Sequence, residues 1–393
     1  MSLRWLVAPQ EFKGTLTASE AAEALQAGLR EAAPEVLLDV APLADGGPGT
    51  VDALLAGAPG ERRVLTVQGP LGAPVEAAYA LLDSGRTAII EMAAASGLSL
   101  LRPEERDARR ASTHGTGELI RAALDAGCSR IIVGMGGSAT NDGGAGALVA
   151  LGYRFLDAEG QPLPPGGAAL RRLARVDITQ RHPRLMEVEL LAATDVTAPL
   201  LGPNGASQLF GPQKGADPHM VAELEEALAW FAQGLAPEFI RVPGAGAAGG
   251  FGYGLAVLAS ANIVSGYGLV AQALHLERRV AVADVVITGE GRFDRQTVLG
   301  KGPASLARSG KELGKPVVLF AGSVAQEEGL DTSLFREVID VGNPPLDKEF
   351  AVRALREAAA RWASTARNEK PDDARDRTQD RTSPDEHMGS GSM

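Results

Sequence analysis

The chain has 393 residues, a formal net charge of −11 and 45% hydrophobic residues, which suffices for two domains with filled cores. The acidic balance argues against a nucleic-acid partner or an anionic membrane, because either would favour a basic surface. We find no signal peptide and no apolar run of bilayer length, and the single cysteine, Cys128, excludes an internal disulfide. These features predict a soluble cytoplasmic protein.

Strand-like and helical segments alternate along most of the chain, which is typical of an α/β fold with a largely parallel sheet. The first strand is expected at residues 5–8 and the first helix begins at a cap, Thr17 or Ser19. Lys13 lies between them, where it could meet a phosphate beside the helix dipole or could simply be a solvated lysine. Asp45 follows the second strand and could bind a ligand or cap the next helix.

The pattern changes near residue 64, where three strand-like runs with turn residues between them predict antiparallel pairing. We interpret this change as the entry into an inserted domain. The expected division is a discontinuous Rossmann-like domain of residues 1–64 and 280–365, an inserted mixed α/β domain of residues 65–279, and a disordered polar tail of residues 366–393.

The most informative stretch is residues 130–152, which reads as a strand, a glycine-rich loop and a small-residue helix ended by a glycine. Such a loop can direct backbone N–H groups at an anion. The same pattern can also form a tight turn that binds nothing, and it matches neither the GxGxxG nor the GxxxxGK[ST] fingerprint. The candidate phosphate-binding residues are Gly136, Gly137, Ser138, Thr140, Asn141, Asp142 and Gly143.

Charged residues recur on other glycine-containing loops after predicted strands. The cations are Lys13, Lys214, Arg292 and Lys301, and the carboxylates are Asp45, Asp195, Glu290 and Asp294. Phosphoryl transfer uses this mixture, because cations and amides bind phosphate oxygens while carboxylates hold Mg²⁺ or accept a hydroxyl proton. His114 also precedes a helix, and we interpret it as a loop residue rather than a catalytic base.

Several long blocks resemble the bacterial class I glycerate kinases in the same order. They are FKGTL (12–16), ADGGPGT (44–50), IEMAAASGLSL (90–100), THGTGELI (113–120), GMGGSATNDGGAGAL (134–148), FGPQKGA (210–216), GAGAAGGFG (244–252) and ADVVITGEGRFDRQTVLGKGP (283–303). The resemblance implies transfer of the ATP γ-phosphoryl group to a hydroxyl of D-glycerate with Mg²⁺, and two α/β domains with a cleft between them. A homodimer is compatible with the sequence, which fixes neither the oligomer nor the phosphorylated hydroxyl.

On this basis we assign Lys13 and Arg292 to charge stabilisation at the phosphoryl group and the substrate carboxylate, and Asp45 to the base. Asp195 and Asp294 are the metal candidates. Lys214 and Lys301 join the glycine loop in binding the nucleotide.

The chain departs from the usual family pattern at Gln10-Glu11, which replace an Asp-Ser pair, and at Pro48, which replaces a glutamate. An alternative is therefore a catalytically weakened protein of the same fold that binds a small acid or a nucleotide. A dinucleotide-dependent oxidoreductase ranks below both because the Rossmann fingerprint is missing.

Overall fold

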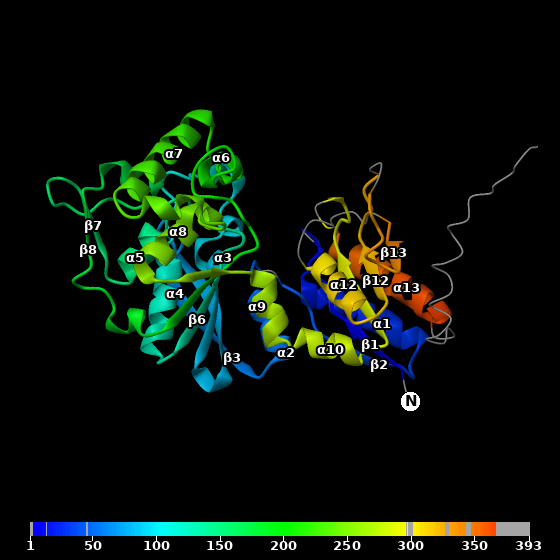
Figure 1. Ribbon diagram of the computed structural model, residues 1–393. Helices are drawn as coiled ribbons and strands as arrows, with labels where there is room; N and C mark the ends of the chain where they lie inside the picture. The colour runs from blue at the N-terminus through cyan, green and yellow to red at the C-terminus, as the bar shows by residue number, and fades with distance from the viewer. Residues whose placement is uncertain are drawn as a thin grey trace, which may run out of the picture.

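We describe the fold from a computed structural model, which describes residues 3–12, 14–44, 46–295, 297, 302–326, 330–342 and 347–366. Two β-sheets lie side by side, and three helices lie between them (Figure 1). These helices are α2 (Thr50–Gly57), α9 (Gly266–Ala273) and α10 (Leu276–Val282). The arrangement confirms the predicted α/β class with mostly parallel pairing, whereas the predicted domain limits stay a prediction. Of the predicted tail, residues 366–393, only residue 366 is among the described residues.

Sheet A is parallel throughout and has the strand order β13-β12-β11-β1-β2. Its strands are β1 (Arg4–Val7), β2 (Leu37–Val40), β11 (Val285–Glu290), β12 (Val317–Ala321) and β13 (Glu337–Asp340). Its remaining helices are α1 (Ala18–Ala32), α12 (Pro303–Glu312) and α13 (Lys348–Ala366). Thr17 caps α1 in a capping box with Glu20, which confirms one of the two predicted caps.

Sheet B has the order β10-β9-β6-β5-β4-β3. Its strands are β3 (Gly60–Gln68), β4 (Pro74–Leu82), β5 (Thr87–Glu91), β6 (Arg130–Gly134), β9 (Glu189–Ala193) and β10 (Asn262–Val264). The pairs β3-β4 and β4-β5 are antiparallel, as predicted, and the other pairs are parallel. Consequently β5, β6 and β9 end at one edge, where open α/β sheets hold ligands.

The helices of this half surround that edge and cover the outer face of sheet B (Figure 1). They are α3 (Met92–Ser96), α4 (His114–Asp125), α5 (Ala145–Ala150), α6 (Ala206–Phe210), α7 (Pro218–Gln233) and α8 (Ala247–Ala259). Two short strands, β7 (Arg154–Leu156) and β8 (Arg175–Asp177), form a separate antiparallel pair. Short 3₁₀ helices cover residues 83–85, 98–100, 103–105, 167–172, 183–186, 212–214 and 237–241.

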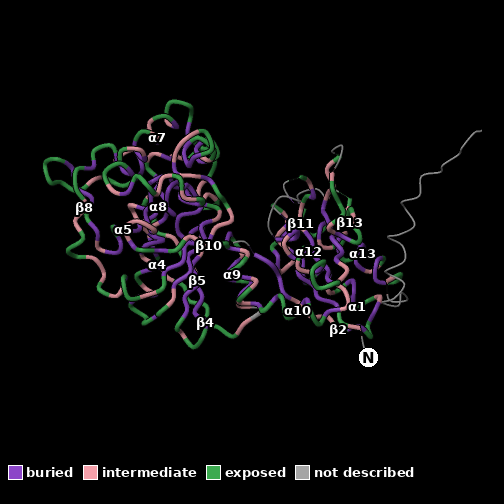
Figure 2. Tube along the Cα trace, in the orientation of Figure 1, coloured by how far each residue is buried: buried purple, intermediate pink, exposed green. Residues whose placement is uncertain are grey.

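One apolar core joins the two sheets. It contains Leu6 and Val286 of sheet A together with Ile89 and Ile132 of sheet B, and the helices between the sheets complete it. The strands that carry these residues, β1, β11, β5 and β6, are mostly buried along the chain trace (Figure 2). Because burial of apolar surface stabilises by about 25 cal/mol per Å², this shared core favours the observed packing of the two sheets.

No helix in the described ranges is both long enough and apolar enough to cross a membrane.

Candidate functional site

Two glycine-rich loops from different sheets meet at the carboxyl ends of β6 and β9. The loop after β2 brings Gly46 there, and its carbonyl accepts a hydrogen bond from the Gly136 N–H at 3.3 Å. A Cβ at Gly134 would lie 2.2 Å from the Gly46 carbonyl oxygen, and one at Gly136 would lie 2.5 Å from the Gly47 Cα. Glycine is therefore required at residues 134 and 136 because the two backbones touch.

A partly buried carboxylate holds the loop after β2 in place. Glu91 ends β5, and its Oε1 accepts a hydrogen bond from the Val51 N–H at 2.7 Å, at the start of α2. The N-cap of α2 is Gly49, which has no side chain to cap the helix, so Glu91 supplies the missing acceptor from another strand. Burial raises the pKa of Glu91, and the hydrogen bonds from the Val51, Gly49 and Thr50 amides oppose that shift.

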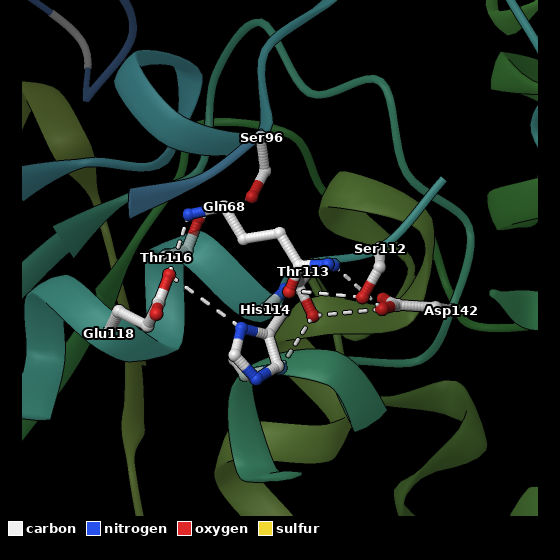
Figure 3. A network of polar contacts seen from close by, with 9 residues as sticks. Gln68, Ser96, Ser112, Thr113, His114, Thr116, Glu118 and Asp142 are labelled. Carbon is white, nitrogen blue, oxygen red and sulfur yellow. Dashed lines mark hydrogen bonds and ion pairs between the residues drawn. The ribbon is translucent and has the colours of Figure 1, made fainter. Parts of the chain in front are cut away.

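The second half of the central loop is organised around Asp142, which is fully buried (Figure 3). Its Oδ2 accepts hydrogen bonds from the Thr113 N–H, the Thr113 hydroxyl and the Gly146 N–H at 2.8, 2.9 and 3.2 Å. Its Oδ1 accepts one from the Gly144 N–H at 3.1 Å. Burial raises the pKa of Asp142, and these hydrogen bonds oppose the shift. The carboxylate thus ties the start of α4 to the start of α5.

Three other predicted phosphate-binding side chains point into the protein. The Lys214 Nζ donates to the Thr140 carbonyl oxygen at 2.7 Å, and the Asn141 Nδ2 donates to the Ser207 hydroxyl at 3.1 Å. Burial lowers the pKa of Lys214 to about 7, although the charge of Asp142 favours the ammonium form. The Thr140 hydroxyl and the Asn141 Oδ1 are buried without a hydrogen-bond partner among the described residues. These three side chains therefore stabilise the loop from inside the protein.

At the edge of sheet A, two carboxylates lie near Arg292. Glu290 ends β11, and its Oε1 is buried without a hydrogen-bond partner in the described part of the chain. Burial raises the pKa of Glu290 to about 7; a hydrogen bond from Thr297 opposes the shift, and the negative charge of Asp294 adds to it. The exposed Arg292 places its Nε 3.7 Å from the Asp294 Oδ2.

The two predicted metal ligands lie on different sheets. Asp195 follows β9 of sheet B, where its Oδ1 accepts from the Ser265 hydroxyl at 2.7 Å and its Oδ2 from the Tyr267 N–H at 3.0 Å. Asp294 follows β11 of sheet A. Burial raises the pKa of Tyr267 to about 12, and the charge of Asp195 adds to that rise. Within the described ranges, no group of three His, Cys, Asp or Glu side chains could hold a metal ion.

Three predicted site residues, Lys13, Asp45 and Lys301, lie outside the described residues, and their roles stay predictions. A described neighbour of Lys301 shows how the loop before α12 is anchored. Gly302 precedes α12, and a Cβ there would lie 2.3 Å from the Gln10 Oε1. Gln10, one of the departures from the family pattern, therefore packs against the start of α12.

Sequence reasoning missed a polar cluster at the end of β3 and the start of α4 (Figure 3). The Glu118 Oε2 accepts from the Gln68 N–H at 2.7 Å and lies 3.7 Å from the His114 Nδ1. The Ser96 and Thr116 hydroxyls are 2.7 Å apart. The THGTGE sequence was a signal for this cluster, but its partners Gln68 on β3 and Ser96 on α3 are visible only in the fold.

Comparison with known proteins identifies one family over nearly the whole chain. The sequence model of the family described as "Glycerate kinase family" matches residues 5–368. A glycerate kinase of Halalkalibacterium halodurans is 46% identical, with 84% of this chain and 89% of that protein covered. The glycerate 2-kinase of Escherichia coli K12 is 43% identical, with coverage of 93% and 100%.

A solved structure agrees with these sequence matches. The crystal structure of a protein from Salmonella typhimurium LT2, proposed to be a glycerate kinase 2, superposes with a TM-score of 0.81 at 42% identity. The match covers 93% of this chain and 99% of that one.

Proposed function

This chain belongs to the glycerate kinase family and phosphorylates glycerate, and on that premise we propose that ATP is the phosphoryl donor, that Mg²⁺ accompanies it, and that the 2-hydroxyl of D-glycerate is the acceptor. The proposal rests on the family match over residues 5–368. The choice of the 2-hydroxyl is supported by the glycerate 2-kinase of E. coli, which is 43% identical over 93% of this chain.

The phosphate groups fit the backbone of the central loop better than its side chains. The Gly136 N–H is hydrogen-bonded to Gly46, so the candidates are Gly137 and Ser138, which lie at the carboxyl edge of sheet B where Ser138 bridges to Gly97. Side chains in the later part of the loop are committed to the internal contacts of Asp142 and Lys214. Backbone amides at such an edge stabilise anions without needing charged side chains.

The carboxylate pair at the edge of sheet A fits a divalent cation. The Glu290 Oε1 is buried without a hydrogen-bond partner among the described residues, and the charge of Asp294 disfavours ionisation of Glu290. A cation would relieve both the missing contact and the repulsion. Mg²⁺ uses one or two protein carboxylates and completes its coordination with phosphates and water, so two oxygen ligands suffice. When bound, it would neutralise charge on the transferring group, and Asp195 stays a second candidate.

The remaining residues bind and orient the acceptor. Arg292 is exposed beside Asp294, and its planar guanidinium can bind the glycerate carboxylate through two hydrogen bonds. In the transfer step, the glycerate hydroxyl oxygen forms a bond to the γ-phosphorus while the bond to the β,γ-bridging oxygen breaks, and ADP leaves. The hydroxyl proton passes to a carboxylate base, for which Asp45 stays our candidate.

The direct test measures ADP release from Mg-ATP with and without D-glycerate and identifies the product by phosphorus NMR. We expect release that depends on D-glycerate and a 2-phosphoglycerate signal. A 3-phosphoglycerate signal would refute only the choice of hydroxyl. Binding of ATP and glycerate without turnover would refute the activity and favour a weakened binding protein, in which case Gln10→Asp and Pro48→Glu are the restoring substitutions to test.

A further inference from the structure

A small cavity of about 110 Å³, here called the slot, lies beside the end of the central glycine loop. Val149 of α5 and Phe155, Leu163 and Leu170 of the following segment form its apolar wall. Phe155 and Leu170 are buried, whereas Val149 is 44% exposed. Val149 therefore contributes an apolar surface to the slot and little to the protein core.

The opposite side of the slot carries hydrogen-bonding groups. Gln68, Ser112 and His114 line it, and all three are labelled in the close-up view (Figure 3). The Ser112 hydroxyl oxygen accepts from the His114 N–H at 3.2 Å, so its own proton remains available for donation. The His114 Nδ1 is buried 3.7 Å from the Glu118 Oε2, so the rest of the ring is what His114 presents to the slot. An apolar wall facing a polar edge suits a planar heterocycle.

The slot adjoins a larger cavity of about 540 Å³, with which it shares Gln68, Ser112, Pro164 and Pro165. Arg109 lines the larger cavity, but its guanidinium is already 3.7 Å from Asp107 and 3.8 Å from Glu223. The charge of Arg109 is thereby largely balanced, and the exposed Arg110 also lines this cavity.

The other end of the slot is formed by Ala145 and Gly146, directly after the central loop. Gly146 allows close packing here, because a Cβ would lie 2.2 Å from the Ser112 Oγ. The Gly146 N–H also donates to Asp142, so this end of the slot and the loop are one hydrogen-bonded unit. The slot is therefore attached to the later part of the central loop, around Asp142.

We propose that the slot binds the purine base of the nucleotide, with Val149 and Phe155 against the ring and Gln68, Ser112 and His114 at its hydrogen-bonding edge. This inference rests on the proposed function, because that function requires a nucleotide whose phosphates lie on the central loop. The adjoining cavity then accommodates the ribose.

The test compares ATP with inorganic tripolyphosphate, which carries the phosphates without a base. Val149→Trp fills the slot from an exposed position, and Val64→Trp on β3 is the control, since Val64 is also exposed, at 55%. By calorimetry, Val149→Trp should weaken ATP binding by about tenfold or more and change tripolyphosphate binding by less than about twofold. Val149→Met should give a smaller change of the same kind, and Val64→Trp should leave both ligands unaffected.

Unchanged ATP binding in Val149→Trp would overturn the proposal, as would equal weakening of both ligands or the absence of ATP binding in the wild type. The experiment needs no acceptor. A slot-dependent affinity for ATP in a protein that releases no ADP with D-glycerate would refute the proposed function and leave the slot assignment intact.

Discussion

Lys214 should make the stability of this protein depend on pH in an unusual direction. Its side chain is only 2% exposed, and its Nζ donates to the Thr140 carbonyl oxygen at 2.7 Å. Burial lowers its pKa from 10.5 to about 7. Replacement by methionine keeps most of the volume, removes the titrating group and leaves the Thr140 carbonyl oxygen without this donor.

The direction of this pH dependence follows from proton binding in the folded and unfolded states. Between about pH 7 and pH 9 the folded protein releases the Lys214 proton, whereas the unfolded chain keeps it, so the free energy of unfolding rises with pH. A fully released proton is worth about 1.4 kcal/mol per pH unit, and because Lys214 is only half deprotonated at pH 7 the two units give about 2.3 kcal/mol. The difference in unfolding free energy between wild type and Lys214→Met should therefore grow by about this amount in favour of the wild type.

Urea unfolding of both proteins at about pH 6, 7, 8 and 9 measures this difference, since the other titrating groups are shared and cancel. Lys311→Met on α12 is the control, because Lys311 is exposed and its removal should leave the pH profile unchanged. The conclusion that Lys214 is buried with a lowered pKa would be refuted by equal pH dependence of the unfolding free energy in wild type and Lys214→Met. A difference that shrinks as the pH rises would refute it as well.

Three further substitutions test the site. Gly134→Ala should cost about 1–3 kcal/mol of stability and most of the activity, because the added Cβ meets the backbone of the facing loop. Gly234→Ala is the control: its Cβ would lie 3.6 Å from the nearest atom, so stability and activity should both be kept. Asp142→Asn should lose about 3 kcal/mol, since it places an amide among N–H and O–H donors, and it should weaken ATP binding. Asp157→Asn, another buried carboxylate that accepts N–H bonds, should lose stability in urea unfolding but keep its affinity for ATP. Arg292→Ala should raise the KM for D-glycerate more than the KM for ATP in steady-state assays, and equal increases would contradict a role at the substrate carboxylate.

The local elements could be predicted from the sequence because their signals are local. The apolar run before Gly134 forms β6, the small-residue run after Gly144 forms α5, and Thr17 caps α1. The alternation of strands and helices indicated the α/β class, and the turn residues near Asp83 indicated antiparallel pairing. In each case the residues that determine the structure are neighbours in the chain.

The site was harder to predict because its contacts join distant segments. Glu91 caps a helix that begins 41 residues earlier in the chain, at Thr50, and no local pattern identifies that partner. Lys214 was expected to contact phosphate, yet its Nζ reaches the Thr140 carbonyl oxygen across 74 residues of sequence. A lysine on a glycine-containing loop has the same local sequence in either position, so only the fold shows the difference in burial.

The glycines illustrate how one pattern can have two physical causes. The run after β6 was interpreted as a phosphate cradle, but residues 134 and 136 must be glycine because the Gly46 loop touches them. Gly249 likewise approaches the Thr140 carbonyl oxygen, and a Cβ there would lie 2.1 Å away. The contacts of Gly134 and Gly136 bring the loops from sheets A and B together at one edge. Close packing and anion binding favour the same residue, glycine, so a glycine motif alone cannot distinguish the two causes. Separate measurements of stability and of ATP binding in Gly134→Ala can distinguish them.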